Sequence, residues 1–428
     1  MRHAYSMSTQ SQRTAGRIAS ILLCLGLLTA APVVAAPPVP AANAAVISTW
    51  NQIAVATATA GGASPAAFNY FAFAHLAMYN AVVGITGEYE LYRWNAPAPH
   101  NASPEAAAAA AAHRVLVTYF PTAAATLDAH LAASLALVPD GGPQDKGISY
   151  GVRAADRIIA LRANDGRNAQ VTPPTGTTPG HWQPEPGAFS TAWLGGVTPI
   201  AIQSAAQFAP GPPPPINSAT YLAEFNEVRD YGGQNADTLR TAGQTLTARF
   251  FSDAGIVPMQ RGLQVYAAAH ALDIDDSARM FAAAETAIAD GAIAVWNAKL
   301  QYMWWRPVTA IRLADTDGNA DTHSVPGWTP LINTPPYPDW PSGLCSVVGA
   351  VSTVLERLNG DGTLGLTITS AAAGNLTRTY ATKAQLTQDA VNARVWSGIH
   401  FRTADQVSIG TSTGVANYVL DHYFRPTD

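Results

Sequence analysis

The stretch FNYFAFAHLAMYNAVVGI, residues 68–85, constrains the fold more than any other part of the chain. Apolar residues recur on nearly every face of a helix drawn through it, and such a helix is stable only when other elements cover it all round. The stretch therefore predicts a central helix. The composition agrees with a large buried interior, because 48% of the 428 residues are hydrophobic and only 12% are charged.

Helical patterns recur along most of the chain. The stretch SPEAAAAAAAHRVLVTYF begins with Ser103 as a helix N-cap and Pro104 at the first helical position. No segment shows a convincing strand alternation, so we expect an all-α fold. Further helices are expected at residues 122–137, 143–164, 217–232, 236–252, 258–305, 343–359, 380–398 and 403–424.

A Pro- and Gly-rich stretch interrupts these patterns at residues 171–216. Its segments VTPPTGTTPGHWQPEP and APGPPPPINS cannot form a regular helix or a central strand. The stretch also holds four aromatic residues, which indicate that it packs over the surface of the protein: Trp182, Phe189, Trp193 and Phe208. We expect one helical domain at 45–428, with an N-terminal half at 45–170, this connection at 171–216 and a second half at 217–428.

The first 44 residues are expected to be a signal peptide and its cleavage region. Arg2, Arg13 and Arg17 precede an apolar stretch rich in small residues, which is typical of an export signal. The expected location is therefore secreted or periplasmic, without a stable membrane anchor. After cleavage only Cys345 remains, so no intramolecular disulfide can form. The formal net charge is −5, and no basic stripe suggests nucleic acid as a partner.

Two cations stand close together in KLQYMWWRP. Lys299 and Arg306 are seven residues apart, which on one continuous helix is nearly two turns and places both on the same face. Burying unpaired charge is costly, so two cations on this apolar segment require an anionic partner. The alternative is a lysine that reaches solvent and an arginine paired with an acidic side chain. The segment alone leaves both interpretations open.

The stretch PDWPSGLCSVVGA, residues 338–350, contains the beginning of a helix. Ser342 is a suitable N-cap, and Gly343 lets a ligand approach the backbone. Free N–H groups at a helix N-terminus can bind an anion. On its own, however, such a stretch is more often only a cap.

The third motif is RVWSGIHFRTAD, residues 394–405. Arg394 and His400 can converge on one ligand if the chain bends at Ser397-Gly398, and Arg402 and Asp405 could support them from behind. A single histidine here would usually be an ordinary core residue. Taken together, the three motifs supply arginine and lysine donors, a helix N-terminus and one imidazole, a set that suits a tetrahedral oxyanion.

At these positions the sequence resembles the vanadium-dependent haloperoxidases and the type 2 phosphatidic acid phosphatases. Their pattern is Lys-x6-Arg-Pro, then Pro-Ser-Gly-His, then Ser/Ala-Arg-x5-His. This chain has Lys299-x6-Arg306-Pro307, then Pro341-Ser342-Gly343-Leu344, then Ala393-Arg394-x5-His400. Four further stretches resemble bacterial haloperoxidases: FAHLAMYNAV, LDAHLAASLALVPDGG, TPIAIQSAAQFAPGPPPP and FNEVRDYG.

The resemblance implies a fold, a cofactor and a reaction. The fold would be all-α, built from two bundle-like halves with the oxyanion in one of them. The reaction would be vanadate-dependent peroxide activation and halide oxidation, with hydrogen peroxide, a halide and a small organic acceptor as partners, and the family allows a homodimer. His400 would bond the vanadium of vanadate and, with Arg306 and Arg394, be catalytic. The residues that would hold the oxygens of vanadate, or of phosphate as a competing anion, are Lys299, Arg306, Ser342, Gly343 and Arg394.

Leu344 departs from the family pattern. The family histidine at this position is a general acid–base, a role typically worth about 10²–10⁴ in rate. Leucine cannot transfer a proton, so we expect a weakened peroxidase in which His323 or Asp339 could reach in as a replacement. Two other functions stay open: hydrolysis of phosphate esters of the acid phosphatase type, and a non-catalytic oxyanion-binding or structural role.

Two further features have ordinary interpretations. Cys345 lies close to a helix N-terminus, where a thiol can become nucleophilic, but its apolar neighbours favour a small buried side chain. Residues 315–321 carry oxygen side chains at alternate positions, as in half of a calcium loop. They lack the later glycine and the closing glutamate of such a loop, so an acidic turn is the better interpretation.

Overall fold

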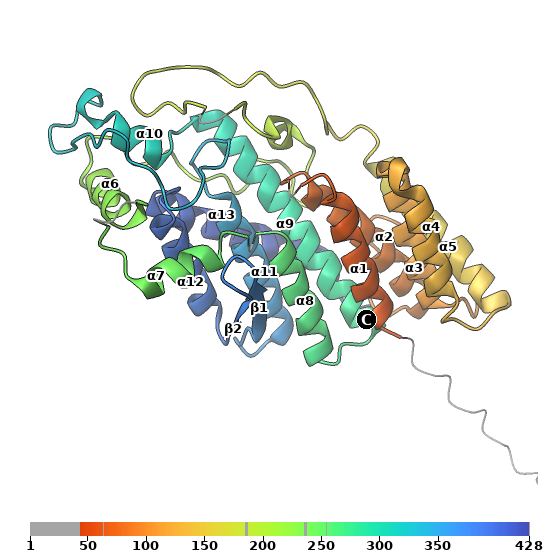
Figure 1. The fold of residues 1–428 in the computed structure, drawn as a ribbon. Helices are drawn as coiled ribbons and strands as arrows, with labels where there is room; N and C mark the ends of the chain where they lie inside the picture. The colour runs from red at the N-terminus through yellow and green to blue at the C-terminus, as the bar shows by residue number, and fades with distance from the viewer. Residues whose placement is uncertain (1–42, 63, 185–186, 235–237, 254, 428) are drawn as a thin grey trace, which may run out of the picture. The chain divides into compact units, whose positions relative to one another are not determined.

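The longest helix among the described residues, α9 (Ile274–Tyr302), is buried along most of its length and organises the fold. It packs against α2 (Ala67–Thr86), α11 (Gly343–Asn359) and α13 (Arg402–His422) (Figure 1). The apolar stretch at 68–85 is α2, and it is buried on nearly all faces. The predictions of a central apolar helix and of a mainly helical fold are confirmed.

The computed structural model describes residues 43–427, apart from 63, 185–186, 235–237 and 254. These described residues all belong to one compact unit. Nearly all of the predicted signal peptide, which we placed at 1–44, lies outside them. Within the described part of the chain, no helix combines the length and the apolar character needed to cross a membrane.

The N-terminal helices pack around α2. The Ser103 hydroxyl caps α3 by accepting a hydrogen bond from the backbone N–H of Ala106 at 3.1 Å, as the sequence predicted. The alanines of α3 let α5 approach so closely that a Cβ on Gly151 would lie 2.1 Å from the carbonyl oxygen of Ala107. The elements of this part are α1 (Ala45–Ala58), α3 (Pro104–Tyr119), η1 (Pro121–Ala123), α4 (Ala124–Leu135) and α5 (Gly142–Leu161).

The predicted helix at 258–305 is wrong as a single element, because the chain forms two helices there. The first, α8 (Val257–Ala269), ends before Ala271, which has a positive φ of 48°. Asp273 then begins α9, and its side chain accepts a hydrogen bond from the backbone N–H of Asp276 at 2.8 Å. The remaining helices are α6 (Ala219–Gly232), α7 (Ala242–Phe250), α10 (Pro307–Arg312), η3 (Ala314–Thr316) and α12 (Lys383–Trp396).

The sequence analysis missed a two-stranded hairpin. Strands β1 (Leu366–Ser370) and β2 (Leu376–Tyr380) pair antiparallel, with Leu366 opposite Tyr380. The alternation exists in LTITS, whose first, third and fifth residues are buried. Five residues are too few for this period to stand out from the helical patterns on either side.

The Pro- and Gly-rich connection is attached to α9, and this confirms that it packs over the surface. The carboxylate of Asp290 accepts hydrogen bonds at 2.6, 2.7 and 2.9 Å from the backbone N–H groups of three consecutive residues, 200–202. At the end of the helix, the N–H of Trp182 donates to the carbonyl oxygen of Met303 at 2.6 Å. The connection also forms the short turn η2 (Ala192–Gly196).

Candidate oxyanion site

Lys299 and Arg306 come together by a route that the sequence analysis did not predict. Helix α9 ends at Tyr302, Met303 takes a left-handed conformation with φ 44°, and Arg306 is the N-cap of α10. The prediction that both cations share one continuous helical face is therefore wrong. Arg306 follows the left-handed residue Met303 and nevertheless contacts the same loop as Lys299.

That loop, residues 337–339, accepts hydrogen bonds from both cations. Lys299 Nζ donates to the carbonyl oxygens of Pro338 at 2.5 Å and Asp339 at 3.1 Å. Arg306 Nε donates to the carbonyl oxygen of Tyr337 at 2.9 Å. Both side chains are almost fully buried. Burial, together with the charge of Arg306, lowers the pKa of Lys299 well below its usual value.

Arg394 and His400 converge through the bend that the sequence analysis required. Helix α12 ends at Trp396, and Gly398 has φ 78°. A Cβ at Gly398 would lie 2.4 Å from the carbonyl oxygen of Gly232, so both the conformation and the space call for glycine. The bend brings His400 Nε2 to 3.0 Å from Arg306 Nη1, and His400 lines the same cavity as Arg394.

Asp339 completes the surroundings of His400. Its Oδ1 lies 2.7 Å from His400 Nδ1 and 3.6 Å from Arg306 Nη1. Burial raises the pKa of Asp339 to about 7, and burial with the charges of Arg306 and Arg394 lowers the pKa of His400 well below its usual value. Neither carboxylate oxygen of Asp339 has a hydrogen-bond partner among the described residues, so this is a close approach of two buried groups and not a hydrogen bond. Arg306 Nη1 lies 3.3 Å from His400 Nδ1 and 3.0 Å from Nε2. From the sequence, Asp339 was expected only as a replacement proton donor, and its closeness to His400 was not predicted.

The helix N-terminus at Ser342 differs in detail from the expectation. Ser342 occupies the N-cap position of α11, but its side chain makes no capping hydrogen bond. Its N–H donates to the carbonyl oxygen of Ala404 at 3.0 Å, which fixes the start of α11 against the start of α13. A Cβ on Gly343 would lie 3.1 Å from the Trp296 ring, so glycine leaves this face of the backbone open.

The donor set fits a tetrahedral oxyanion. Arg306 Nη2 and Arg394 Nε are buried donors that have no hydrogen-bond partner among the described residues. Lys299 adds a third buried positive charge close to them. Leaving buried donors and charges unpaired is costly, and an anion with several oxygens would pair them. Vanadate and phosphate both have the required shape and charge.

Neither residue considered as a replacement for the missing histidine stands in its place. Asp339 is fully buried, but its carboxylate is turned to His400 and Arg306. His323 is exposed and does not line the cavity that contains His400. Leu344 itself lines that cavity, next to Gly343.

Asp405 and Arg402, which were expected to support Arg394 and His400 from behind, have different surroundings. Asp405 is fully buried beside Cys345, whose Sγ lies 3.5 Å from the Asp405 carboxylate. Burial, with the charge of Asp405, raises the pKa of the Cys345 thiol well above its usual value, so the thiol is an inert core group. Arg402 instead pairs with Glu227 at 2.6 Å and does not contribute to the site.

Residues 315–321 form an acidic turn. The Asp315 carboxylate accepts from the N–H and hydroxyl of Ser324 at 2.9 and 2.5 Å, and the Asp317 carboxylate accepts from the hydroxyl of Thr322 at 2.8 Å. Among the residues that the structure describes, no group of three or more His, Cys, Asp or Glu side chains is arranged to hold a metal ion. The interpretation as an ordinary turn is the one that these hydrogen bonds favour.

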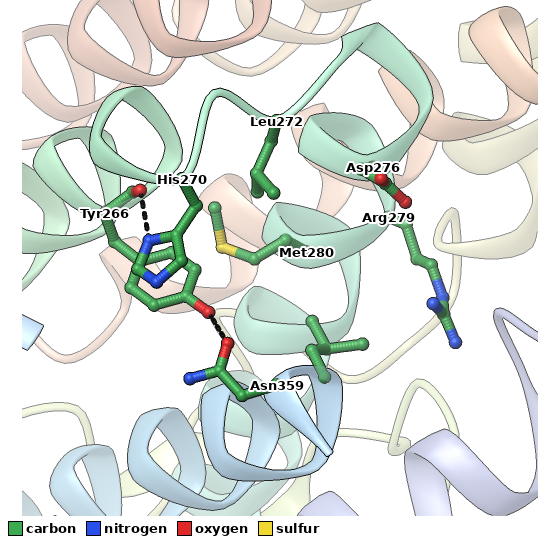
Figure 2. Close-up of a pocket in the computed structure, with 8 residues that line it drawn as sticks. Tyr266, His270, Leu272, Asp276, Arg279, Met280 and Asn359 are labelled. Carbon is green, nitrogen blue, oxygen red and sulfur yellow. Dashed lines mark hydrogen bonds between the residues drawn. The ribbon is translucent and has the colours of Figure 1, made fainter. Parts of the chain in front are cut away.

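A smaller pocket of about 110 Å³ lies elsewhere, between α8, α9 and α11 (Figure 2). The His270 ring stacks on Tyr266 with 3.9 Å between the ring centroids, and the Tyr266 hydroxyl donates to Asn359. Met280 points toward the His270 ring. None of the predicted site residues lines this pocket.

The comparisons with known proteins agree with this geometry. Residues 279–428 match the family of VCPO second helical-bundle domains. A vanadium chloroperoxidase of Curvularia inaequalis is 36% identical over 92 residues, which are 19% of this chain and only 14% of that enzyme. The match therefore spans a small part of the relative's length.

Two solved structures have the same fold over most of their length. A bacterial vanadium-dependent iodoperoxidase is 24% identical, covers 90% of this chain and 96% of its own, and has a TM-score of 0.73. A bacterial vanadium-dependent chloroperoxidase, in its holo form, is 18% identical and has a TM-score of 0.70. The match covers 89% of this chain and 97% of the chloroperoxidase chain. This chain therefore has the fold of the bacterial vanadium haloperoxidases, and its residues 279–428 match the family of VCPO second helical-bundle domains.

Proposed function

We propose that the chain is a vanadate-dependent peroxidase that oxidises halide with hydrogen peroxide, consuming a proton and releasing hypohalous acid and water. The observation that carries the proposal is the buried cluster of Lys299, Arg306 and Arg394 around His400, with two donors unpaired among the described residues. The vanadium chloroperoxidase and iodoperoxidase relatives support it. Bound vanadate would supply the peroxide-activating chemistry.

The roles of the side chains follow from their contacts. Lys299, Arg306 and Arg394 would hold the anion's oxygens and stabilise negative charge that develops on them. Ser342 and the N–H of Gly343 would add donors at the start of α11. His400 would offer Nε2 to the vanadium, and the Asp339 carboxylate lies 2.7 Å from its Nδ1.

Aromatic rings keep this charge cluster out of water. Lys299 Nζ lies 5.1 Å from the centroid of the Tyr337 ring and 5.7 Å from that of Trp296. Arg306 Cζ lies 5.1 Å from the Tyr337 ring centroid. In such a low-dielectric site, fixed charges act more strongly on a bound anion than they would in water.

Hydrolysis of phosphate esters is the weaker alternative. The same cluster would hold phosphate, and His400 could attack phosphorus. An ester leaving group needs a proton, however, and Leu344 cannot provide it. We therefore expect phosphate to act as a competitor of vanadate rather than as a product.

The test uses purified protein freed of bound anions. Orthovanadate, hydrogen peroxide and bromide are added with phenol red, and a parallel assay uses p-nitrophenyl phosphate without vanadate. We expect bromination that requires vanadate and falls when phosphate is added. His400→Ala should abolish it, while His323→Ala, which changes an exposed histidine outside the site, should not. Ester cleavage inhibited by vanadate, or anion binding without either activity, would overturn the proposal.

We also propose that the protein is exported and acts in the periplasm or outside the cell. The proposal comes from the arginines and apolar stretch of the first 44 residues. N-terminal sequencing of protein recovered from the periplasm or medium should show that residues up to about Ala36 or Ala44 have been removed. Recovery only in the cytoplasm with an intact N-terminus would contradict it.

A further inference from the structure

A cavity of about 490 Å³ opens directly onto the oxyanion site. Gly343, Arg394 and His400 line it, so a molecule inside it can reach the place where the anion would be held. Sites for small organic molecules usually measure about 300–1,000 Å³. A halide ion and hydrogen peroxide need far less space, since one water molecule takes up about 30 Å³ in the liquid.

The walls of this cavity are largely apolar and come from four helices. Phe68 comes from α2, Pro258 from α8, Trp296 from α9 and Val347 from α11. Flat aromatic walls of this kind favour a molecule that can pack against rings. They offer little to a strongly hydrated or highly charged one.

The polar residues of the cavity outside the anion site do not change this character. The Asp253 carboxylate accepts from the Ser370 hydroxyl at 2.7 Å and from the Ala372 N–H at 3.1 Å, so its oxygens already have partners in the hairpin region. Arg261 is exposed to solvent. Most of the residues that line the cavity are therefore apolar.

Leu344 contributes an apolar side chain to this cavity. It lines the cavity beside Gly343, at the position where the family pattern has a proton-transferring histidine. A leucine there offers apolar contact area to a neighbouring molecule, and covering that area stabilises binding. The substitution thus replaces a polar group with a contact surface.

We propose that this cavity binds the organic acceptor as an uncharged, aromatic molecule, and that Leu344 is one of its contacts. The inference rests on the proposed function, because the bound molecule would receive the halogen made at the neighbouring site. In that step the aromatic carbon forms a bond to the halogen of hypohalous acid and loses its hydrogen as a proton. Hydroxide leaves the halogen and takes up a proton, so the products are the aryl halide and water.

The first test measures binding and does not depend on turnover. Equilibrium dialysis of 2-naphthol is performed with the full-length protein saturated with orthovanadate, in the absence of peroxide and halide, beside the charged 2-naphthalenesulfonate. Orthovanadate fills the anion site, so the sulfonate cannot bind there. We expect 2-naphthol to bind at least tenfold more tightly. Equal or reversed affinities of the two probes, or no binding of 2-naphthol, would overturn the proposal.

The second test locates the bound molecule. Leu344→Asn should weaken 2-naphthol binding at least tenfold, and Leu344→Ala, which inserts no polar group, about threefold or more. The matched control is Leu137→Asn, the same change at a leucine that is 81% exposed and does not line the cavity. Circular dichroism confirms folding of each variant. If both Leu344 variants bind 2-naphthol as Leu137→Asn does, the proposal is wrong.

A kinetic comparison separates this proposal from the proposed function. In the wild type, the rate of vanadate-dependent bromination should saturate at 2-naphthol concentrations near the dissociation constant measured by dialysis. In Leu344→Asn, saturation should require a 2-naphthol concentration at least tenfold higher. Bromination without saturation in the wild type would overturn the acceptor site while supporting the peroxidase. Tight, Leu344-dependent binding without any bromination would support the binding site and contradict the peroxidase.

Discussion

Asp339 Oδ1 lies 2.7 Å from His400 Nδ1, and both side chains are almost fully buried. A hydrogen bond from Nδ1 to this carboxylate would fix the tautomer and the orientation of the ring and make the other nitrogen a better ligand. In this chain the other nitrogen, Nε2, belongs to a ring that lines the cavity beside the anion site. The contact therefore links the loop before α11 to the residue that would bond vanadium.

Replacing Asp339 with leucine should weaken orthovanadate binding about 10–100-fold, the usual cost of losing the partner of a metal-binding histidine. The affinity for inorganic phosphate should fall less, because phosphate forms no bond to the imidazole. Asp339→Asn keeps a carbonyl oxygen that can accept from Nδ1 and should recover part of the loss. Isothermal titration with both anions measures the difference. Equal losses for both would indicate a purely structural role for Asp339.

Restoring a proton donor tests the meaning of Leu344 for turnover. Leu344→His should raise the kcat of vanadate-dependent phenol red bromination by about tenfold or more, since general acid–base groups typically contribute about 10²–10⁴. Its affinity for 2-naphthol should fall at the same time, because a polar ring replaces an apolar contact. Steady-state kinetics and dialysis give the two values. An unchanged kcat would show that proton transfer at this position does not limit the reaction.

Much of the fold and of the site could be predicted because local patterns were strong. The apolar stretch that became α2, the Ser103 cap and the bend at Gly398 each depend on residues close together in sequence. The prediction that the cationic motifs bind an anion depends only on their residue types, because such side chains require an anionic partner where they are buried.

What could not be predicted depends on contacts between distant segments. Nothing near Met303 in the sequence shows that it takes φ 44°, because methionine ordinarily avoids this conformation. The Asp339–His400 contact joins residues 61 positions apart in the sequence. Hydrophobic periodicity carries no information about which buried acid meets which histidine.

Asp290 should be essential for attaching the Pro- and Gly-rich connection to α9. Its carboxylate is the acceptor for three consecutive backbone N–H groups, at 200–202. Asp290→Ala would leave these donors without that acceptor and should lower the free energy of unfolding by about 2–4 kcal/mol. Urea denaturation measures this loss, with Asp128→Ala, at an exposed aspartate, as the control. A change below about 0.5 kcal/mol, the range of ordinary surface substitutions, would show that the contact is dispensable.

Glu285 should make the stability of the protein depend on pH. Its side chain is fully buried and accepts a hydrogen bond from Gln260 Nε2 at 2.7 Å, and burial raises its pKa to about 8. In the unfolded chain the carboxyl group ionises near pH 4.5, so between these two values the folded state keeps a proton that the unfolded state has lost. Stability must then fall as the pH rises through this window.

Glu285→Gln removes this titration while its side-chain oxygen can still accept from Gln260. The free energy of unfolding of the variant, relative to that of the wild type, should increase by about 2 kcal/mol or more as the pH rises from about 5 to about 8. Below about pH 4.5 this difference should change little. Urea denaturation at several pH values measures the difference between the two proteins, in which the titrations of all other groups largely cancel. A difference that stays constant from pH 4 to pH 8 would mean that Glu285 ionises alike in the folded and unfolded chains.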